Sequence, residues 1–157
     1  MHTIRLMEKK LLLPFESPRD QYRADATVVW CYDSRFTLAL QVLAEKMGWK
    51  NFDLIKLDGG VRDLGSLGNE AERSYVLNQI SKSLRSHKAP EIFIMAHYNC
   101  GGLGREQMDP TDDEDMFLGQ ELKQGKEAVE RYLVSAGLSA KVRPLLCDFK
   151  NIYEVDF

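Results

Sequence analysis

Short apolar runs alternate along the chain with longer segments in which apolar residues recur every three or four positions. Residues 27–30 and 92–96 are runs of apolar and β-branched side chains, a pattern typical of strands that are buried on both faces. A further strand is predicted over residues 52–57. Helical spacing extends over residues 34–47, 69–84 and 114–135. Strands that alternate with helices predict an α/β fold, with a mainly parallel central sheet flanked by helices.

The C-terminal segment predicts an edge strand or a hairpin. Residues 142–147 have the composition of a strand, but they include Pro144. Proline cannot donate a hydrogen bond to a neighbouring strand, which favours the edge of the sheet. Residues 152–155 are expected to pair back on this strand as a hairpin.

The first 26 residues predict an extended arm. Pro14 and Pro18 would interrupt any long helix, yet the segment contains an apolar run at residues 11–13. Such an arm often packs on a neighbouring subunit. We therefore interpret residues 1–157 as a single α/β domain with residues 1–26 as its N-terminal arm.

Composition and charge exclude several classes of protein. The chain has 157 residues, of which 44% are hydrophobic and 29% charged, as in a globular domain rather than a disordered or membrane protein. Its formal net charge of -3 provides no electrostatic basis for binding nucleic acid. No apolar run approaches the roughly 20 residues of a membrane-spanning helix, and the first ten residues lack a signal-peptide core. We expect a cytoplasmic protein that binds neither nucleic acid nor membrane.

Reactive side chains follow the predicted strands directly. The segment CYDSR occupies residues 31–35 and the segment HYNC occupies residues 97–100. In a parallel sheet, ligands bind outside the carboxyl ends of the strands, so Cys31, Asp58 and His97 should lie along one rim. Three cysteines cannot all pair, and in a reducing compartment thiols grouped with a histidine favour metal binding or catalysis.

Zinc is the metal that this combination of side chains favours, because it binds thiolate, imidazole and carboxylate groups in a tetrahedron. His97 and Cys100 can supply two adjacent ligands from one turn, and Cys31 can supply a third from another strand. Asp33 is either a fourth ligand or a neighbour of the ligands. Each residue also has a simpler explanation: a buried cysteine packs as a small apolar residue, and Asp33 with Arg35 forms an ion pair at a helix start. Their joint occurrence at strand ends favours the metal site.

The two segments resemble the signatures of the β-class carbonic anhydrases. CYDSR is similar to that family's Cys-x-Asp-Ser-Arg, and HYNCG is similar to its His-x-x-Cys-Gly. The resemblance implies an enzyme that reversibly hydrates carbon dioxide to bicarbonate through zinc-bound hydroxide. By position, the zinc ligands would be Cys31, His97 and Cys100. Asp33 and Arg35 would form the catalytic pair, in which Arg35 keeps the carboxylate off the metal; in a closed state Asp33 would be the fourth ligand.

The resemblance also implies substrate contacts and a partner. Gly101, directly after the second signature cysteine, is a candidate for substrate binding. Gln21 is another, because the family often places a bicarbonate-binding glutamine before its first cysteine. Asp58, at the mouth of the site, is the third. Members of the family form dimers with active sites at the subunit interface, which implies a homodimer or a higher homo-oligomer.

Two departures from the family leave alternatives open. Leu57 and Asp58 replace a neutral Asn-Ala pair, which adds a carboxylate that would repel bicarbonate, and the N-terminal helices that wrap the partner are shortened. One alternative is a zinc-binding homologue without carbon dioxide hydratase activity, serving as a regulatory or binding module. The other is a related hydrolase of carbonyl sulfide or carbon disulfide.

Overall fold

The computed structural model describes residues 7–105 and 112–157, and it confirms the predicted α/β fold. Within these residues, five strands form one sheet in the order β2-β1-β3-β4-β5. Four of them run parallel, and they are β1 (Ala26–Cys31), β2 (Phe52–Leu57), β3 (Glu91–His97) and β4 (Lys141–Cys147). β5 (Ile152–Glu154) pairs antiparallel with β4, which confirms the predicted hairpin.

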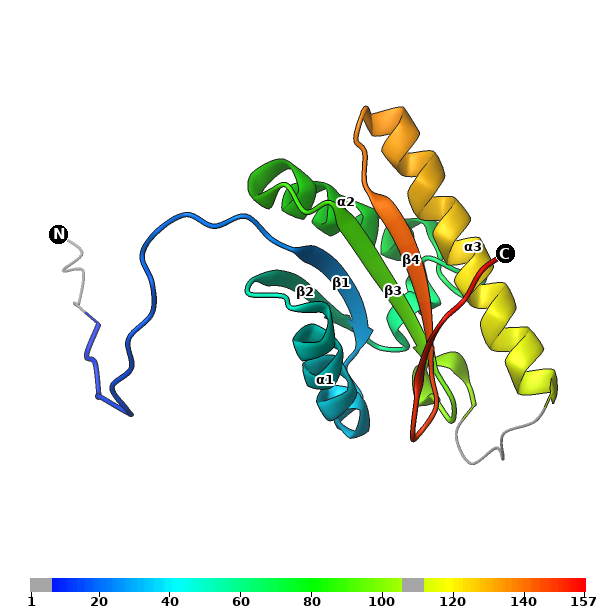
Figure 1. Cartoon of the computed structure of the whole chain (residues 1–157), viewed down its shortest axis with the longest axis horizontal. Helices are drawn as coiled ribbons and strands as arrows, with labels where there is room; N and C mark the ends of the chain where they lie inside the picture. The colour runs from blue at the N-terminus through cyan, green and yellow to red at the C-terminus, as the bar shows by residue number, and fades with distance from the viewer. Residues whose placement is uncertain (1–6, 106–111) are drawn as a thin grey trace, which may run out of the picture.

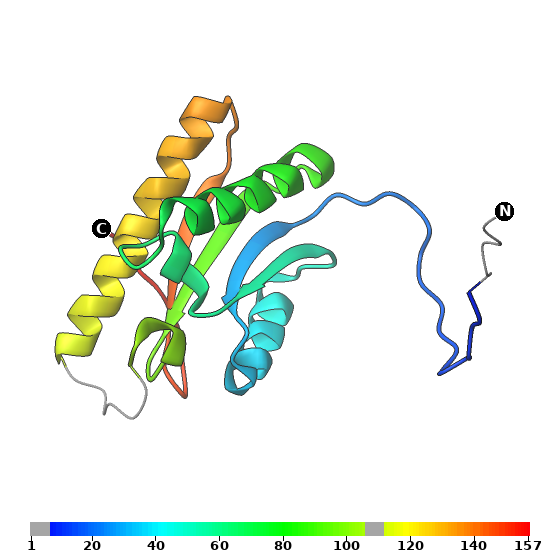
Figure 2. The same ribbon diagram turned by 180° about the vertical axis from the view of Figure 1, so that it is seen from behind.

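Helices cover both faces of the sheet. α1 (Thr37–Met47) lies on one face (Figure 1), whereas α2 (Glu70–His87) and α3 (Asp112–Ala136) lie on the other, as the reverse view shows (Figure 2). The predicted helices agree with these bounds to within three residues, and the start of the first one is a separate 3-10 turn, η1 (Ser34–Phe36). None of the helices in the described ranges is long and apolar enough to cross a lipid bilayer.

Burial explains why the two clearest strand predictions were apolar throughout. All six residues of β1 are buried, and so are all residues of β3 except the first. Both strands are central and covered by helices on each side, so neither face can carry a solvated side chain. β2 lies at an edge of the sheet, and its residues are only partly buried or exposed.

The chain connections run in opposite directions from β1 and β3. The chain leaves β1 through α1 towards β2, on one side, and leaves β3 through α3 towards β4, on the other. β1 and β3 are nevertheless paired neighbours. Such a reversal is the topological switch point at which open α/β sheets bind ligands. Here it separates the residues that follow Cys31 from those that follow His97.

The expected edge position of Pro144 was wrong, because β4 lies between β3 and β5. The Pro144 carbonyl accepts a hydrogen bond from the Val155 N–H (3.0 Å), so the hydrogen-bonding side of the Pro144 backbone points towards β5 rather than towards β3. Because proline has no N–H, Pro144 cannot donate a second hydrogen bond to β5 on this side. Ladder pairing with β5 accordingly stops at Leu145, opposite Glu154.

An extended N-terminal segment leaves the body of the molecule (Figure 1). Every residue from 7 to 23 is exposed. Its end is attached at the amino edge of the sheet, where the Tyr22 hydroxyl donates to Asp53 (2.7 Å) and His87 Nδ1 lies 2.7 Å from the same carboxylate. The arm therefore begins at the edge opposite to the carboxyl ends of the strands.

A glycine at the carboxyl edge provides a test of the packing beside β1 and β3. Gly60 has φ +58, and an added Cβ would collide with the Met95 carbonyl oxygen and lie 3.3 Å from the Cys31 nitrogen. We expect Gly60→Ala to lower the free energy of unfolding by roughly 3 kcal/mol. The control is Gly48→Ala, at φ +69 with nothing within 4 Å of the new Cβ, which should cost only about 1 kcal/mol. Equal losses in urea unfolding would contradict this account.

Candidate metal centre

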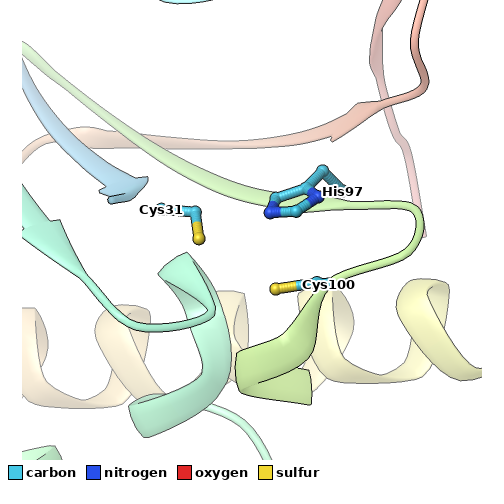
Figure 3. A group of neighbouring side chains, drawn as sticks. All are labelled: Cys31, His97 and Cys100. Carbon is cyan, nitrogen blue, oxygen red and sulfur yellow. The ribbon is translucent and has the colours of Figure 1, made fainter. Parts of the chain in front are cut away.

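Three side chains from two strand ends and the following turn point towards one another (Figure 3). Cys31 ends β1, His97 ends β3, and Cys100 is the N-cap of η3 (Gly101–Leu103). All three are buried, and their donor atoms lie within 4.8 Å of one another. Ligands of a tetrahedral zinc ion are about 3.5–3.8 Å apart, so a small contraction would close these atoms around the ion. We call these three residues the ligand cluster.

The turn between the second and third ligands depends on unusual backbone geometry. Asn99 has φ +56, a conformation that asparagine adopts more readily than most residues. The Cys100 carbonyl then accepts N–H groups from Leu103 (3.2 Å) and Arg105 (2.8 Å). Gly102 follows at a position where an added Cβ would collide with the Asp58 carboxylate. The chain can therefore bend back sharply and return Cys100 to the cluster.

The imidazole of His97 is prepared for a metal by its second nitrogen. Nδ1 lies 2.8 Å from the Tyr98 carbonyl oxygen, so this nitrogen carries the proton and donates. Nε2 is then a lone-pair acceptor, and it is buried without a hydrogen-bond partner in the part of the chain that the structure describes. A histidine ligand whose other nitrogen donates to a carbonyl is common in zinc sites. This buried, unsatisfied nitrogen fits a zinc ligand.

The two thiols of the cluster share one proton. The pKa of Cys31 lies well below its ordinary value, chiefly because the Cys100 thiol donates to its sulfur, and also because the backbone N–H of Asp33 donates to it. The pKa of Cys100 is raised, because its proton is held by Cys31 and because the site is buried. The lowered pKa of Cys31 favours the thiolate, which is the form that binds zinc. Cys147, by contrast, has a pKa raised to about 12 by burial, as expected of a packing residue.

An ion pair lies at the edge of the ligand cluster. Asp33 accepts hydrogen bonds from the backbone N–H of Arg35 (3.0 Å), from its Nε (3.0 Å) and from its Nη2 (2.6 Å). These bonds hold the pKa of Asp33 below its ordinary value. Asp33 Oδ2 is also 3.8 Å from Nε2 of His97. The carboxylate thus lies beside the cluster but is turned towards arginine; we call these two residues the Asp33–Arg35 pair.

The remaining candidate residues lie at different distances from the cluster. Asp58 borders it, because its carboxylate packs against Gly102 and raises the pKa of Tyr32. Gly101 begins η3, directly after the third ligand. Gln21 lies in the exposed arm, before the amino end of β1, so its own chain does not bring it to the cluster. Substrate contacts of all three remain predictions.

Two residues at the site were not singled out from the sequence. Asn99 accepts from Arg35 with both its side-chain oxygen and its carbonyl (3.1 Å each), and Glu114 accepts from the Asn99 N–H (2.9 Å). Asn99 lies inside the HYNC segment, so a turn with positive φ was a possible signal. Glu114 stands in an acidic stretch that is typical of a solvated helix start, and nothing local distinguishes it.

Comparison with known proteins defines the family. The chain belongs to the family described as "Putative carbonic anhydrase", whose model matches residues 22–142. A comparison with curated proteins gives no match.

Solved structures share the fold. β-Carbonic anhydrase isoform I of Trichomonas vaginalis is 18% identical over 90% of this chain and 87% of its own, with a TM-score of 0.53. The β-carbonic anhydrase CcaA is 13% identical over 87% and 75%, with a TM-score of 0.58. A tetrameric β-carbonic anhydrase of Sordaria macrospora is 12% identical over 88% and 83%, with a TM-score of 0.50. The chain is a divergent member of the β-carbonic anhydrase family.

Substitution of one thiol tests the ligand cluster. Cys100→Ser should abolish tight zinc binding, because it removes one of the thiolate sulfurs that bind the ion. Zinc content, measured by elemental analysis after dialysis, should fall from about one ion per chain, the stoichiometry of a single site, to near zero. The control is Cys147→Ala, a buried thiol outside the cluster, which should keep its zinc. Full zinc content in Cys100→Ser would refute the assignment.

Proposed function

We propose that this protein is a zinc-dependent carbonic anhydrase, which reversibly hydrates carbon dioxide to bicarbonate. The observation that carries the proposal is a buried ligand cluster with the Asp33–Arg35 pair at its edge. Family membership and the shared fold support it. The cluster lies at the topological switch point, where this class of sheet binds its ligands.

The ligand cluster has the composition that zinc requires. The ion would be held by the two thiolate sulfurs and by Nε2 of His97. Two thiolates balance the charge of the ion, which limits the electrostatic cost of placing it in a buried site. When bound, zinc supplies the Lewis acidity that makes water a nucleophile near neutral pH.

The Asp33–Arg35 pair can orient the nucleophile. Arginine keeps Asp33 ionised at neutral pH, and an ionised carboxylate only accepts hydrogen bonds. At the edge of the cluster, Asp33 therefore favours a hydroxyl group that directs its hydrogen towards the carboxylate. The lone pair of that oxygen is then left for carbon dioxide. The same bonds from Arg35 keep the carboxylate from turning into the cluster.

Asp58 affects which substrates can approach. Its carboxylate stands at the rim beside Gly102, where it repels an anion such as bicarbonate but not a neutral molecule. This repulsion weakens bicarbonate binding and speeds its release, while the entry of carbon dioxide is unaffected. The same observation supports a second candidate, hydrolysis of carbonyl sulfide or carbon disulfide, which are also neutral and linear.

Catalysis is tested by stopped-flow hydration of carbon dioxide with the zinc-loaded protein from about pH 6.5 to 9. We expect turnover in the native protein, and Asp33→Asn should keep the zinc but lose on the order of 10²-fold in kcat. The control is Asp63→Asn, because Asp63 also pairs with an arginine (Arg62, 2.7 Å) but is not a member of the ligand cluster. Unchanged turnover in Asp33→Asn would contradict its role.

The same assay separates the alternatives. Absence of hydration by a native protein that holds one zinc ion per chain would refute the carbonic anhydrase proposal. Hydrolysis of carbonyl sulfide by that protein would then support the second candidate. Zinc binding without either activity would indicate a regulatory or binding module.

We also propose that the protein forms a homodimer or a higher homo-oligomer in the cytoplasm, as one domain whose residues 1–26 are an arm. The exposed arm carries large apolar side chains, namely Met7, Leu11, Leu12, Leu13 and Phe15. A groove of about 650 Å³ runs between α1 and the β4–β5 hairpin, from Arg35 past Val42 and Phe149. A second copy can cover both surfaces. The three free cysteines suit a reducing compartment.

Sedimentation velocity tests the assembly. The native chain should sediment as a dimer or larger species, and the double substitution Leu12→Asp with Phe15→Asp should shift it towards monomer, because charged side chains are costly to bury. Lys10→Asp is the control, because it adds a negative charge to the same arm without removing an apolar side chain. A native monomer at micromolar concentration would contradict the proposal.

A further inference from the structure

Helix α3 carries two buried carboxylates, Glu114 and Glu121. They are seven residues apart, about two helical turns, and so lie on one side of the helix. Each holds the backbone of a different loop. Glu114 accepts from the Asn99 N–H (2.9 Å), and Glu121 accepts from the N–H (2.9 Å) and the hydroxyl of Ser66. The first loop joins His97 at the end of β3 to Cys100, and the second follows the Asp58 rim.

Hydrogen bonds among the described residues connect the first carboxylate, Glu114, to the Asp33–Arg35 pair. The Asn99 N–H donates to Glu114, while its Oδ1 and carbonyl oxygen accept from Nη1 and Nη2 of Arg35 (3.1 Å each). Nε and Nη2 of Arg35 in turn donate to Asp33 (3.0 and 2.6 Å). These contacts form a continuous series from the buried helix to the edge of the ligand cluster.

The pair needs such support because it is close to solvent. The Arg35 side chain is 47% exposed, so water competes for its hydrogen bonds, and an exposed ion pair alone fixes a long side chain poorly. Asn99 accepts hydrogen bonds from the edge of the guanidinium that does not face Asp33. It can do so only while its backbone keeps the turn with φ +56. Glu114, which is fully buried, holds the N–H of that turn.

We propose that Glu114 is a positioning residue for the Asp33–Arg35 pair. Acting through Asn99, it fixes the guanidinium so that Asp33 remains turned towards Arg35 and away from the zinc ligands. This role deepens the proposed function, and its catalytic test rests on that function. The structural test, which measures Arg35 itself, is independent of any activity.

The test measures Arg35 directly, by NMR on the metal-free protein. The Arg35 Nε–H resonance, assigned by its loss in Arg35→Lys, reports the bonds to Asp33. In Glu114→Leu, we expect its exchange with water to accelerate on the order of tenfold, as for loss of a supporting hydrogen bond. Glu114→Gln keeps an acceptor oxygen and should restore most of the protection. An unchanged rate in folded Glu114→Leu would overturn the proposal.

Glu121→Leu is the matched control. It removes a carboxylate of equal burial from the same side of α3, and it releases Ser66 rather than Asn99. It should lower the unfolding midpoint without changing the Arg35 Nε–H exchange rate. Equal acceleration in both variants would mean general loosening of α3 and would also overturn the proposal.

A second variant covers failure of Glu114→Leu to fold. Asn99→Gly tolerates the positive φ and keeps the carbonyl acceptor, but it removes Oδ1 and should accelerate Arg35 exchange to a smaller extent. No acceleration there would again contradict the series of contacts.

The zinc-loaded form provides the catalytic readout. In Glu114→Leu, we expect kcat to fall with KM and zinc content unchanged. An inactive native protein would refute the carbonic anhydrase proposal, while the exchange rates would still decide the role of Glu114. Native activity with kcat unaltered in folded Glu114→Leu would overturn the positioning role alone.

Discussion

The site depends on the parallel pairing of β1 with β3. Val29 lies opposite Ile94 in this pairing, and from that register both strands run to their carboxyl ends, where Cys31 and His97 become neighbours. Slippage by one residue would turn every side chain of a strand to the other face. Because both strands are buried on both faces, any other register would also disturb the core. The positions of Cys31 and His97 in the candidate metal centre are therefore fixed by the two strands that are buried on both faces.

Close backbone packing completes the cluster. The third ligand comes from a turn rather than a strand, and turns are less rigid than strands. Here the turn is confined at Gly102, which approaches Asp58 and the Gly59 nitrogen so closely that no side chain fits, while Gly60 packs equally closely on Met95 and Cys31. These contacts bring the loops after β2 and β3 together over the end of β1. Arg35 and Asp58 remain exposed beside the buried ligand cluster.

The sequence predicts the fold and the grouping of Cys31, His97 and Cys100 well, because both depend on local pattern. Cys31 and His97 end apolar runs, and the ends of neighbouring parallel strands meet wherever such runs form the centre of a sheet. Pro144 was expected at an edge because proline lacks an N–H, whereas the hairpin strand β5 covers β4 and its ladder ends at Leu145, directly beside Pro144. Glu114 was missed for a different reason: its burial comes from a loop 15 residues away. The metal-binding types of side chain can thus be recognised from a local sequence pattern. The residues that hold them in place come together only in the tertiary structure.

The seven-residue interval between the two buried glutamates of α3 also restricts how this chain can vary. One inserted or deleted residue between Glu114 and Glu121 would rotate one carboxylate by about 100° relative to the other. Either Asn99 or Ser66 would then lose its acceptor, although every side chain of the ligand cluster would still be present. We expect related chains to keep the number of residues between these two glutamates. Between them, such chains should differ by substitution and not by insertion.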